Sequence, residues 1–262
     1  MKKLSLVPIF LISAAALGFE IFLTRFFSIV SWSEYAYWVI SITMVGFAVS
    51  GVVLSMGEKF WKPRAERVLS VIPPLLAVSA ALGYVLITLI PFNPLEFQNP
   101  GTWIDQLFNI WKYYGALFPF FFLAGSFIGL YFLAGQDSIS KIYAADLFGA
   151  GAGSLLILLI MYFLHPFLLP VVIIPIILLA SFFQRPPGKI PKISFIIFFI
   201  ALAILCEFAI VHWNRADFNQ YKDIFPPLHV EGNAVVGQKF SPEGYFLTLD
   251  NFTERLDVDF SN

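Results

Sequence analysis

The sequence predicts an all-α polytopic membrane protein with about seven transmembrane helices and a short C-terminal β-hairpin tail. Of its 262 residues, 59% are hydrophobic and only 13% are charged, whereas about 25% of residues are charged in soluble domains. The mean hydropathy is +0.81. Between Leu4 and Trp213, apolar segments follow one another with only short charged loops between them. These observations exclude a soluble globular enzyme or binding domain.

The crossings are placed by length and by the residues that interrupt them. A crossing needs about 20 mainly apolar residues, so we divide the chain where charged residues, prolines and asparagines cluster. The predicted crossings are Leu4–Val30, Tyr35–Met56, Val68–Pro91, Gly115–Ala134, Ala144–Leu164, Pro166–Phe183 and Ile193–Trp213. The boundary between the fifth and sixth depends on His165, Pro166 and Pro170. A re-entrant pair is the alternative there.

The first segment has a second interpretation. Lys2 and Lys3, an apolar stretch and the run Ala14–Ala16 resemble a secretory signal with its cleavage site. The apolar run continues through Ile29, however, which a cleaved signal does not require. We therefore interpret it as the first crossing.

Basic residues predict the orientation, because loops rich in Lys and Arg stay in the cytoplasm. One set of alternate loops carries Lys2, Lys3, Lys59, Lys62, Arg64, Arg67, Lys141, Arg185, Lys189 and Lys192, whereas the opposite loops carry only Lys112. We expect a protein of the cell membrane, with a cytoplasmic N-terminus and the tail after Trp213 outside.

Two regions follow from these boundaries: a helical bundle over residues 1–213 and an extramembrane tail over residues 214–262. Between the third and fourth crossings, Trp103, Leu107, Ile110, Trp111 and Tyr114 recur at helical spacing. Thr102 is placed to cap this segment, with Asp105 three residues later. An amphipathic helix lying at the interface over about 101–114 is the plain interpretation, and a substrate lid is the alternative.

The tail has the character of strands. Val235 and Val236 and the segment Phe246–Leu249 flank Ser241–Gly244, in which Pro242 and Gly244 suit a type I turn. We expect a β-hairpin. A hairpin within about fifty residues buries too little apolar surface to fold alone, so we expect the tail to be the start of an incomplete domain.

Two glycine pairs predict close contacts between helices. Gly125 and Gly129 form one pair, and Gly149 and Gly153 form the other. Small residues at this spacing let helices approach each other in lipid. The run around Gly149 also resembles a dinucleotide-binding loop, but no strand precedes it and the helix continues as a crossing.

Four ionisable residues fall inside the predicted crossings: Glu20, Arg25, Asp146 and Glu207. A charge at membrane depth costs about 2.5–3.5 kcal/mol on insertion scales, so such residues face a partner or a polar cavity. We expect Arg25 to pair across helices with Glu207, with Glu20 in the same polar cluster. Asp146 is expected to cap or neutralise near Lys141. A structural role and a binding site for a polar solute or ion both remain open.

The sequence contains no signal for a metal, a cofactor or a catalytic group. His165, His212 and His229 do not have the i, i+3 or i, i+4 spacing that joins metal ligands. No nucleophile and base are paired, so an intramembrane enzyme is disfavoured. The expected partners are the lipid bilayer and another protein, not nucleic acid.

Two segments resemble a known family. The segments Gly18–Ser28 and Tyr143–Ala150 are similar to segments of the polytopic spermidine-synthase-like proteins, in which a membrane bundle precedes an aminopropyltransferase-like domain. Tyr221–Asp223 and Ser241–Tyr245 resemble the entry into that domain. The resemblance implies a membrane module of a polyamine-forming system.

The glycine-rich loop and the acidic residues that bind the substrates in that family would follow the hairpin, and the chain ends before them. We therefore expect an integral membrane module that anchors or partners a separate or missing catalytic half and is not catalytic alone. A small-solute transporter or channel with a polar site in its outer half is the alternative.

Overall fold

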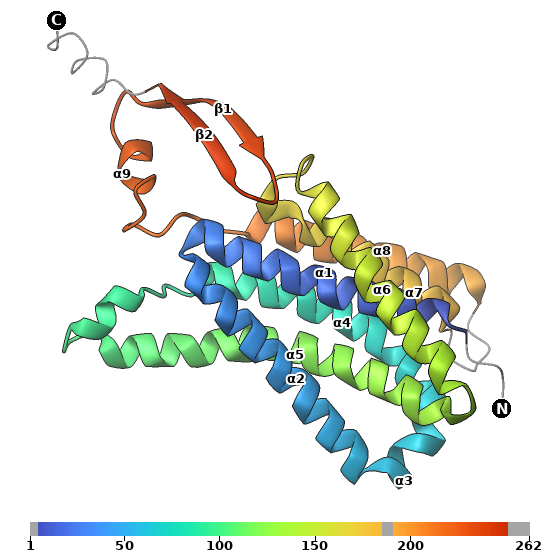
Figure 1. Ribbon diagram of the computed structural model, residues 1–262. Helices are drawn as coiled ribbons and strands as arrows, with labels where there is room; N and C mark the ends of the chain where they lie inside the picture. The colour runs from blue at the N-terminus through green and yellow to red at the C-terminus, as the bar shows by residue number, and fades with distance from the viewer. Residues whose placement is uncertain (1–4, 185–190, 251–262) are drawn as a thin grey trace, which may run out of the picture.

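The computed structural model describes residues 5–184 and 191–250 as a bundle of long helices with a β-hairpin at one end (Figure 1). The basic residues Lys2, Lys3, Arg185 and Lys189, and the predicted tail after Asp250, lie outside the described residues. Helix α1 begins at the end of the bundle opposite the hairpin. We call the hairpin end the tail-side end.

Within the described residues, seven helical segments are long and apolar enough to cross a membrane. Their main helices are α1 (Val7–Val30), α2 (Ala36–Met56), α4 (Ala65–Leu89), α5 (Trp103–Ala134), α6 (Ile139–Ile160), α7 (Pro170–Phe183) and α8 (Lys192–Trp213). The short helix α3 (Glu58–Trp61) lies between α2 and α4, and the short helix α9 (Phe225–Leu228) lies in the tail before the hairpin. The prediction of an all-α polytopic fold with a hairpin tail is confirmed.

The predicted interfacial helix over about 101–114 is wrong as a separate element. Its residues form the first turns of α5, which continues without a break for 32 residues. At a rise of 1.5 Å per residue this helix is about 48 Å long, which exceeds the hydrocarbon core of about 30 Å. The polar residues that suggested a solvated face instead bond to the preceding loop: Gln106 donates to Glu96 (2.8 Å) and Asn109 to the carbonyl oxygen of Pro91 (2.8 Å).

Thr102 occupies the N-cap position of α5 as predicted, but its side chain does not cap the helix. The hydroxyl group donates instead to the carbonyl oxygen of Glu96 at 3.0 Å. This hydrogen bond also fastens the start of α5 to the loop that follows α4.

The break between α6 and α7 lies where His165 and Pro166 predicted it. Helix α6 ends at Ile160, and a 3₁₀ turn at Pro166–Leu168 leads into α7. The imidazole of His165 caps this turn, because its Nδ1 atom accepts the N–H of Phe167 at 3.2 Å.

Both glycine pairs lie at helix contacts, as predicted. A Cβ atom added at Gly149 or Gly153 of α6 would overlap the backbone of Phe10 or Ala14 on α1. A Cβ atom at Gly125 of α5 would meet Ser50 and Phe47 of α2, and one at Gly129 would meet Leu54. Helix α1 is the most enclosed crossing, with 61% of its apolar window buried against 22% for α6 and for α8.

The tail forms the predicted antiparallel hairpin. Strands β1 (Ala234–Phe240) and β2 (Tyr245–Asp250) pair from Ala234 with Asp250 to Phe240 with Tyr245, with an irregularity between Val235 and Gly237. The hydroxyl oxygen of Ser241 accepts the backbone N–H groups of Glu243 (3.2 Å) and Gly244 (3.1 Å). The turn is therefore closed by its first side chain as well as by its backbone.

Candidate functional site

The tail is fastened to the ends of two crossings before it reaches the hairpin. Asn214 donates from Nδ2 to the Tyr84 hydroxyl of α4 at 2.8 Å, and the N–H of Arg215 bonds to Thr88 Oγ1 at 3.2 Å. The N–H of Asn219 then bonds to the carbonyl oxygen of Val30 at 2.8 Å, at the end of α1. The segment from 214 to 219 therefore runs as a strap across the tail-side end of the bundle.

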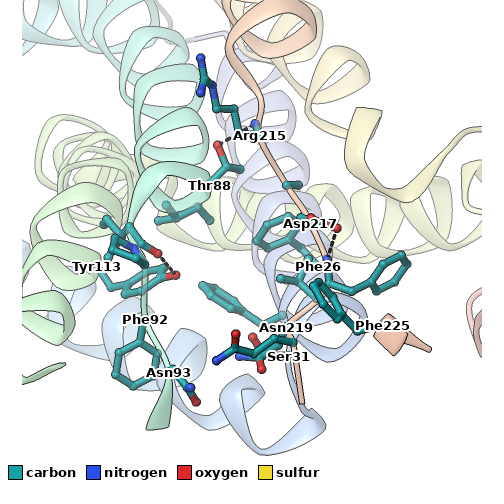
Figure 2. Close-up of a pocket in the computed structure, with 18 of the residues that line it drawn as sticks. Phe26, Ser31, Thr88, Phe92, Asn93, Tyr113, Arg215, Asp217, Asn219 and Phe225 are labelled. Atoms are coloured by element: carbon teal, nitrogen blue, oxygen red, sulfur yellow. Dashed lines mark hydrogen bonds between the residues drawn. The ribbon is translucent and has the colours of Figure 1, made fainter. Parts of the chain in front are cut away.

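This strap lines one side of an open cavity of about 430 Å³, and the helix ends line the other. Figure 2 shows the aromatic rings of Phe26, Phe92, Tyr113 and Phe225 around it. Its polar lining residues are Ser31, Thr88, Asn93, Glu96, Arg215, Asp217, Asn219 and Gln220. The guanidinium group of Arg215 points away from the labelled rings, and its backbone bonds to Thr88. Aromatic walls with a few polar groups are typical of sites for small organic molecules.

Lys222 closes the end of α1. Its ammonium group donates to the carbonyl oxygens of Ser28 (2.8 Å) and Ile29 (2.7 Å), which lack partners within the helix. A cation at this position also interacts favourably with the negative end of the helix dipole. Burial lowers the pKa of Lys222, and the positive charge of Arg25 lowers it further.

Arg25 lies beside Lys222 and reaches the hairpin. Its guanidinium group donates to Ser28 Oγ and to the carbonyl oxygen of Ser241, each at 3.5 Å. These bonds are long, since charge-assisted N–H···O bonds are about 2.7–2.9 Å. The Nε atom is buried, and it has no hydrogen-bond partner among residues 5–184 and 191–250. The carboxylate that attracts the guanidinium is Glu243 in the hairpin turn.

His165 completes the contact between the bundle and the hairpin. Its ring lies 5.2 Å from the ring of Phe240 and 5.1 Å from that of Tyr245, measured between centroids. Burial lowers the pKa of His165 and raises that of Tyr245. Both side chains are therefore neutral near pH 7, which suits an aromatic cluster.

The predicted pair between Arg25 and Glu207 is wrong for the described residues. Helix α8, which carries Glu207, packs mainly on α4 and α7, while Arg25 turns toward the hairpin of the tail. Hydropathy locates each crossing along the chain but not its neighbours, so the sequence did not reveal this arrangement. Glu207 is half-buried on α8 and is not brought into the Arg25 cluster.

Glu20 and Asp146 lie deeper, on α1 and α6. Asp146 accepts a hydrogen bond from Ser13 of α1, so its partner is this hydroxyl group and not Lys141 as expected. Glu20 is half-buried and makes no side-chain hydrogen bond within the described part of the chain. It lies seven residues after Ser13, two turns further along the same face of α1. The four predicted residues therefore do not form one site.

The residues that fasten the tail were missed. Asn214, Asn219 and Lys222 belong to a segment without regular periodicity, and their partners are helix ends far away in the sequence. Helix ends always expose backbone carbonyl groups. The sequence signal for these contacts was a lysine in the segment that follows the last crossing.

Residues 5–184 and 191–250 contain no group of three or more His, Cys, Asp and Glu side chains that could hold a metal ion. The chain matches no protein-family model, and no curated protein or solved structure was found to be similar to it. The function is therefore argued from the tail-side end itself.

Proposed function

We propose that this chain is the integral membrane module of a spermidine-synthase-like system, which anchors or partners a separate aminopropyltransferase-like half and is not catalytic alone. The resemblance of two segments to that family supports the proposal. These segments lie on α1 and α6, which pack along each other, with Gly18 against Ile157 and Ser13 bonded to Asp146.

The observation that carries the proposal is the seating of the tail. Bonds from Asn214 and Asn219 hold the strap to α4 and α1, and Lys222 bonds to the end of α1 just after the strap. The Arg25 and His165 contacts hold the hairpin. A simple tether would not need these contacts. A seated hairpin presents one fixed surface to a partner, which is what a platform for a catalytic half requires.

The surface of the hairpin offers apolar side chains for such a partner. Val236 is 64% exposed and Phe246 is 54% exposed, although polar residues stand near them in the hairpin sequence. A two-stranded sheet is only marginally stable by itself in water, so a contact with a larger domain would stabilise it. We place the catalytic half on this surface.

A crosslinking experiment with an enzyme assay tests the proposal. The chain is crosslinked in its native membrane, purified, and assayed for spermidine formation from putrescine and decarboxylated S-adenosylmethionine. We expect activity in the crosslinked complex and none in the purified chain. Val236→Glu and Phe246→Glu should remove the activity from the complex, whereas Lys112→Gln on α5, outside the hairpin, should not. Activity of the chain alone, or an inactive complex, contradicts the proposal.

For the location, we propose the cell membrane with the basic loops in the cytoplasm and the tail outside. The distribution of Lys and Arg supports this orientation. Lys59, Lys62, Arg64 and Lys141 lie near the end of the bundle opposite the hairpin.

The second candidate function is binding or transport of a small solute, and the tail-side cavity favours it. Its volume of about 430 Å³ suits a small organic molecule, and Glu96 and Asp217 supply carboxylate groups. Thermal unfolding of the purified chain in detergent, with polyamines, amino acids and sugars added separately, tests this function. Stabilisation by a solute that is lost in Asp217→Asn but kept in Glu34→Gln would support it. No stabilisation by any of these solutes would contradict it.

A further inference from the structure

Two cations lie side by side at the tail-side end of α1. Arg25 and Lys222 both bond to Ser28, one to its hydroxyl group at 3.5 Å and the other to its carbonyl oxygen at 2.8 Å. The positive charge of Arg25 acts on Lys222 and disfavours a second positive charge beside it. Like charges this close repel each other, so the arrangement favours a negative partner.

The protein supplies only part of that partner. Glu243 attracts Arg25 from the exposed hairpin turn, but within the described residues it forms no close ion pair with the guanidinium group. The two hydrogen bonds of the terminal guanidinium nitrogens are both long, so these nitrogens are only weakly bonded within the protein. His165, which contacts the same hairpin, adds no charge when neutral.

The depth of Arg25 indicates where a partner would come from. Arg25 lies five residues, or about 7.5 Å, before the end of α1. Trp32 lies two residues after that end, and Trp213 ends α8 at the same side of the bundle. Tryptophans are enriched at the level of the lipid headgroups. Long cationic side chains placed just below this level extend toward the headgroups.

The neighbouring surface carries an exposed apolar ring. Phe163, in the turn that follows α6, is 84% exposed. This turn leads to His165, which contacts the hairpin that Arg25 also reaches. A bulky apolar ring so exposed beside the interface is typical of a side chain that inserts among lipids.

We propose that Arg25 and Lys222 together bind the phosphate of a phospholipid headgroup from the tail-side leaflet. A guanidinium group binds phosphate oxygens through two parallel N–H groups, and an ammonium group adds a point charge. Lys222 keeps one N–H free after its two bonds to α1. The bound lipid would fix the hairpin against the membrane, independently of any catalytic partner.

Lipid titration of the purified protein tests the proposal. The probe is dioleoylphosphatidylglycerol added to the chain in detergent, read as the rise in melting temperature and as lipid retained in native mass spectrometry. Dioleoylglycerol has the same acyl chains without the phosphate, and sodium phosphate supplies the anion without the chains. We expect stabilisation and retention with the phospholipid only.

Variants locate the site. Arg25→Gln and Lys222→Gln should each raise the half-saturating lipid concentration about tenfold, which is the effect expected for one charge-assisted bond. Lys112→Gln is the matched control, because this lysine of α5 bonds to Asn109, whose amide group bonds to Pro91 just after the end of α4. It should leave the concentration unchanged.

Three results would overturn the proposal. Equal stabilisation by dioleoylglycerol would show a site for acyl chains only, and equal stabilisation by sodium phosphate would show a free-phosphate site. An unchanged titration in both Arg25→Gln and Lys222→Gln would place the lipid elsewhere. If Arg25→Gln does not fold, Lys222→Gln and the wild-type titrations decide the question, and Arg25→Lys provides a variant that keeps the charge.

Discussion

The ammonium group of Lys222 lies 2.7 Å from the carbonyl oxygen of Ile29, so that a residue of the tail closes the end of the first crossing. This bond is one of several that join the two regions of the chain, residues 1–213 and the tail. It also occupies carbonyl groups that the helix cannot satisfy itself. The tail is thereby a structural part of the bundle.

Removing this contact should loosen the tail. We expect Lys222→Met to lower the free energy of unfolding by about 1 kcal/mol, because hydrogen bonds from a charged group are lost but the group is partly solvated. Limited proteolysis in detergent should cut the variant sooner between the last crossing and the hairpin. Lys239→Met, on the exposed side of β1, is the control. Equal cleavage of both variants would show that Lys222 does not hold the tail.

Acidification should weaken the seat of the hairpin through His165. Burial lowers the pKa of His165 below its usual 6.5, so the folded protein binds its proton less tightly than the unfolded chain does. Stability is therefore lost as the pH falls from 6.5 through the folded pKa, and it is constant above 6.5. Protonation also removes the Nδ1 acceptor that caps the turn at Phe167. The titratable side chain in contact with the ring, Tyr245, stays neutral.

This pH dependence can be measured by hydrogen exchange of the hairpin amides between pH 7.5 and pH 5. We expect faster exchange at low pH in the wild type. His165→Asn keeps a cap for the turn without a titratable ring, so its exchange, corrected for the intrinsic pH effect, should be constant. The same acid sensitivity in that variant would exclude His165 as the cause.

The contact between α1 and α6 should tolerate no side chain at Gly153. A Cβ atom there would overlap the backbone of Ala14, so Gly153→Ala should cost about 1–3 kcal/mol, as overpacking does. Gly151 on the same helix has no atom within 4 Å of the added Cβ. Gly151→Ala should be neutral or stabilising by up to about 1 kcal/mol. Thermal unfolding in detergent compares the two, and equal losses would show that α6 does not pack through Gly153.

The crossings could be predicted because hydropathy is a local property. Each predicted segment contains the main part of a helix, and small residues at Gly149 and Gly153 marked a real contact. The start of α5 was predicted wrongly because tertiary contacts determine the role of its polar residues. Gln106 and Asn109 look solvated by composition, but they bond to a loop that only the fold brings near.

The site was harder to predict, because it consists of contacts between distant segments. Arg25 could be singled out because a charged side chain inside an apolar helix is energetically unfavourable. Its neighbours Lys222, Ser241 and Glu243, however, belong to the tail. Glu207 was predicted as the partner of Arg25 because both residues are expected at a similar depth in the membrane. Depth along a helix says nothing about which helices are adjacent, and α8 lies mainly against α4 and α7.

The orientation predicts opposite labelling of two introduced cysteines. In a Cys206→Ala background, Asp137→Cys lies in the loop between α5 and α6, and Glu243→Cys lies in the hairpin turn. Three crossings separate them, so a membrane-impermeant maleimide should label only position 243 in intact cells. Detergent should expose both. Labelling of both positions in intact cells would mean that one of the three segments does not cross.

The last prediction concerns Arg25 on α1, which packs most extensively on α6, and Glu207 on α8, which packs most extensively on α4. If they formed a buried pair, removing one partner would leave an unpaired charge, and the double variant would lose less than the sum of the two single losses. Because the Arg25 side chain turns toward Ser241 and Glu243, we expect Arg25→Met and Glu207→Gln to be additive within about 0.5 kcal/mol. Arg25→Met with Glu243→Gln should instead lose less than the sum. Unfolding of all five variants in one detergent measures both cycles, and a larger coupling to Glu207 than to Glu243 would contradict the arrangement of α1 and the tail.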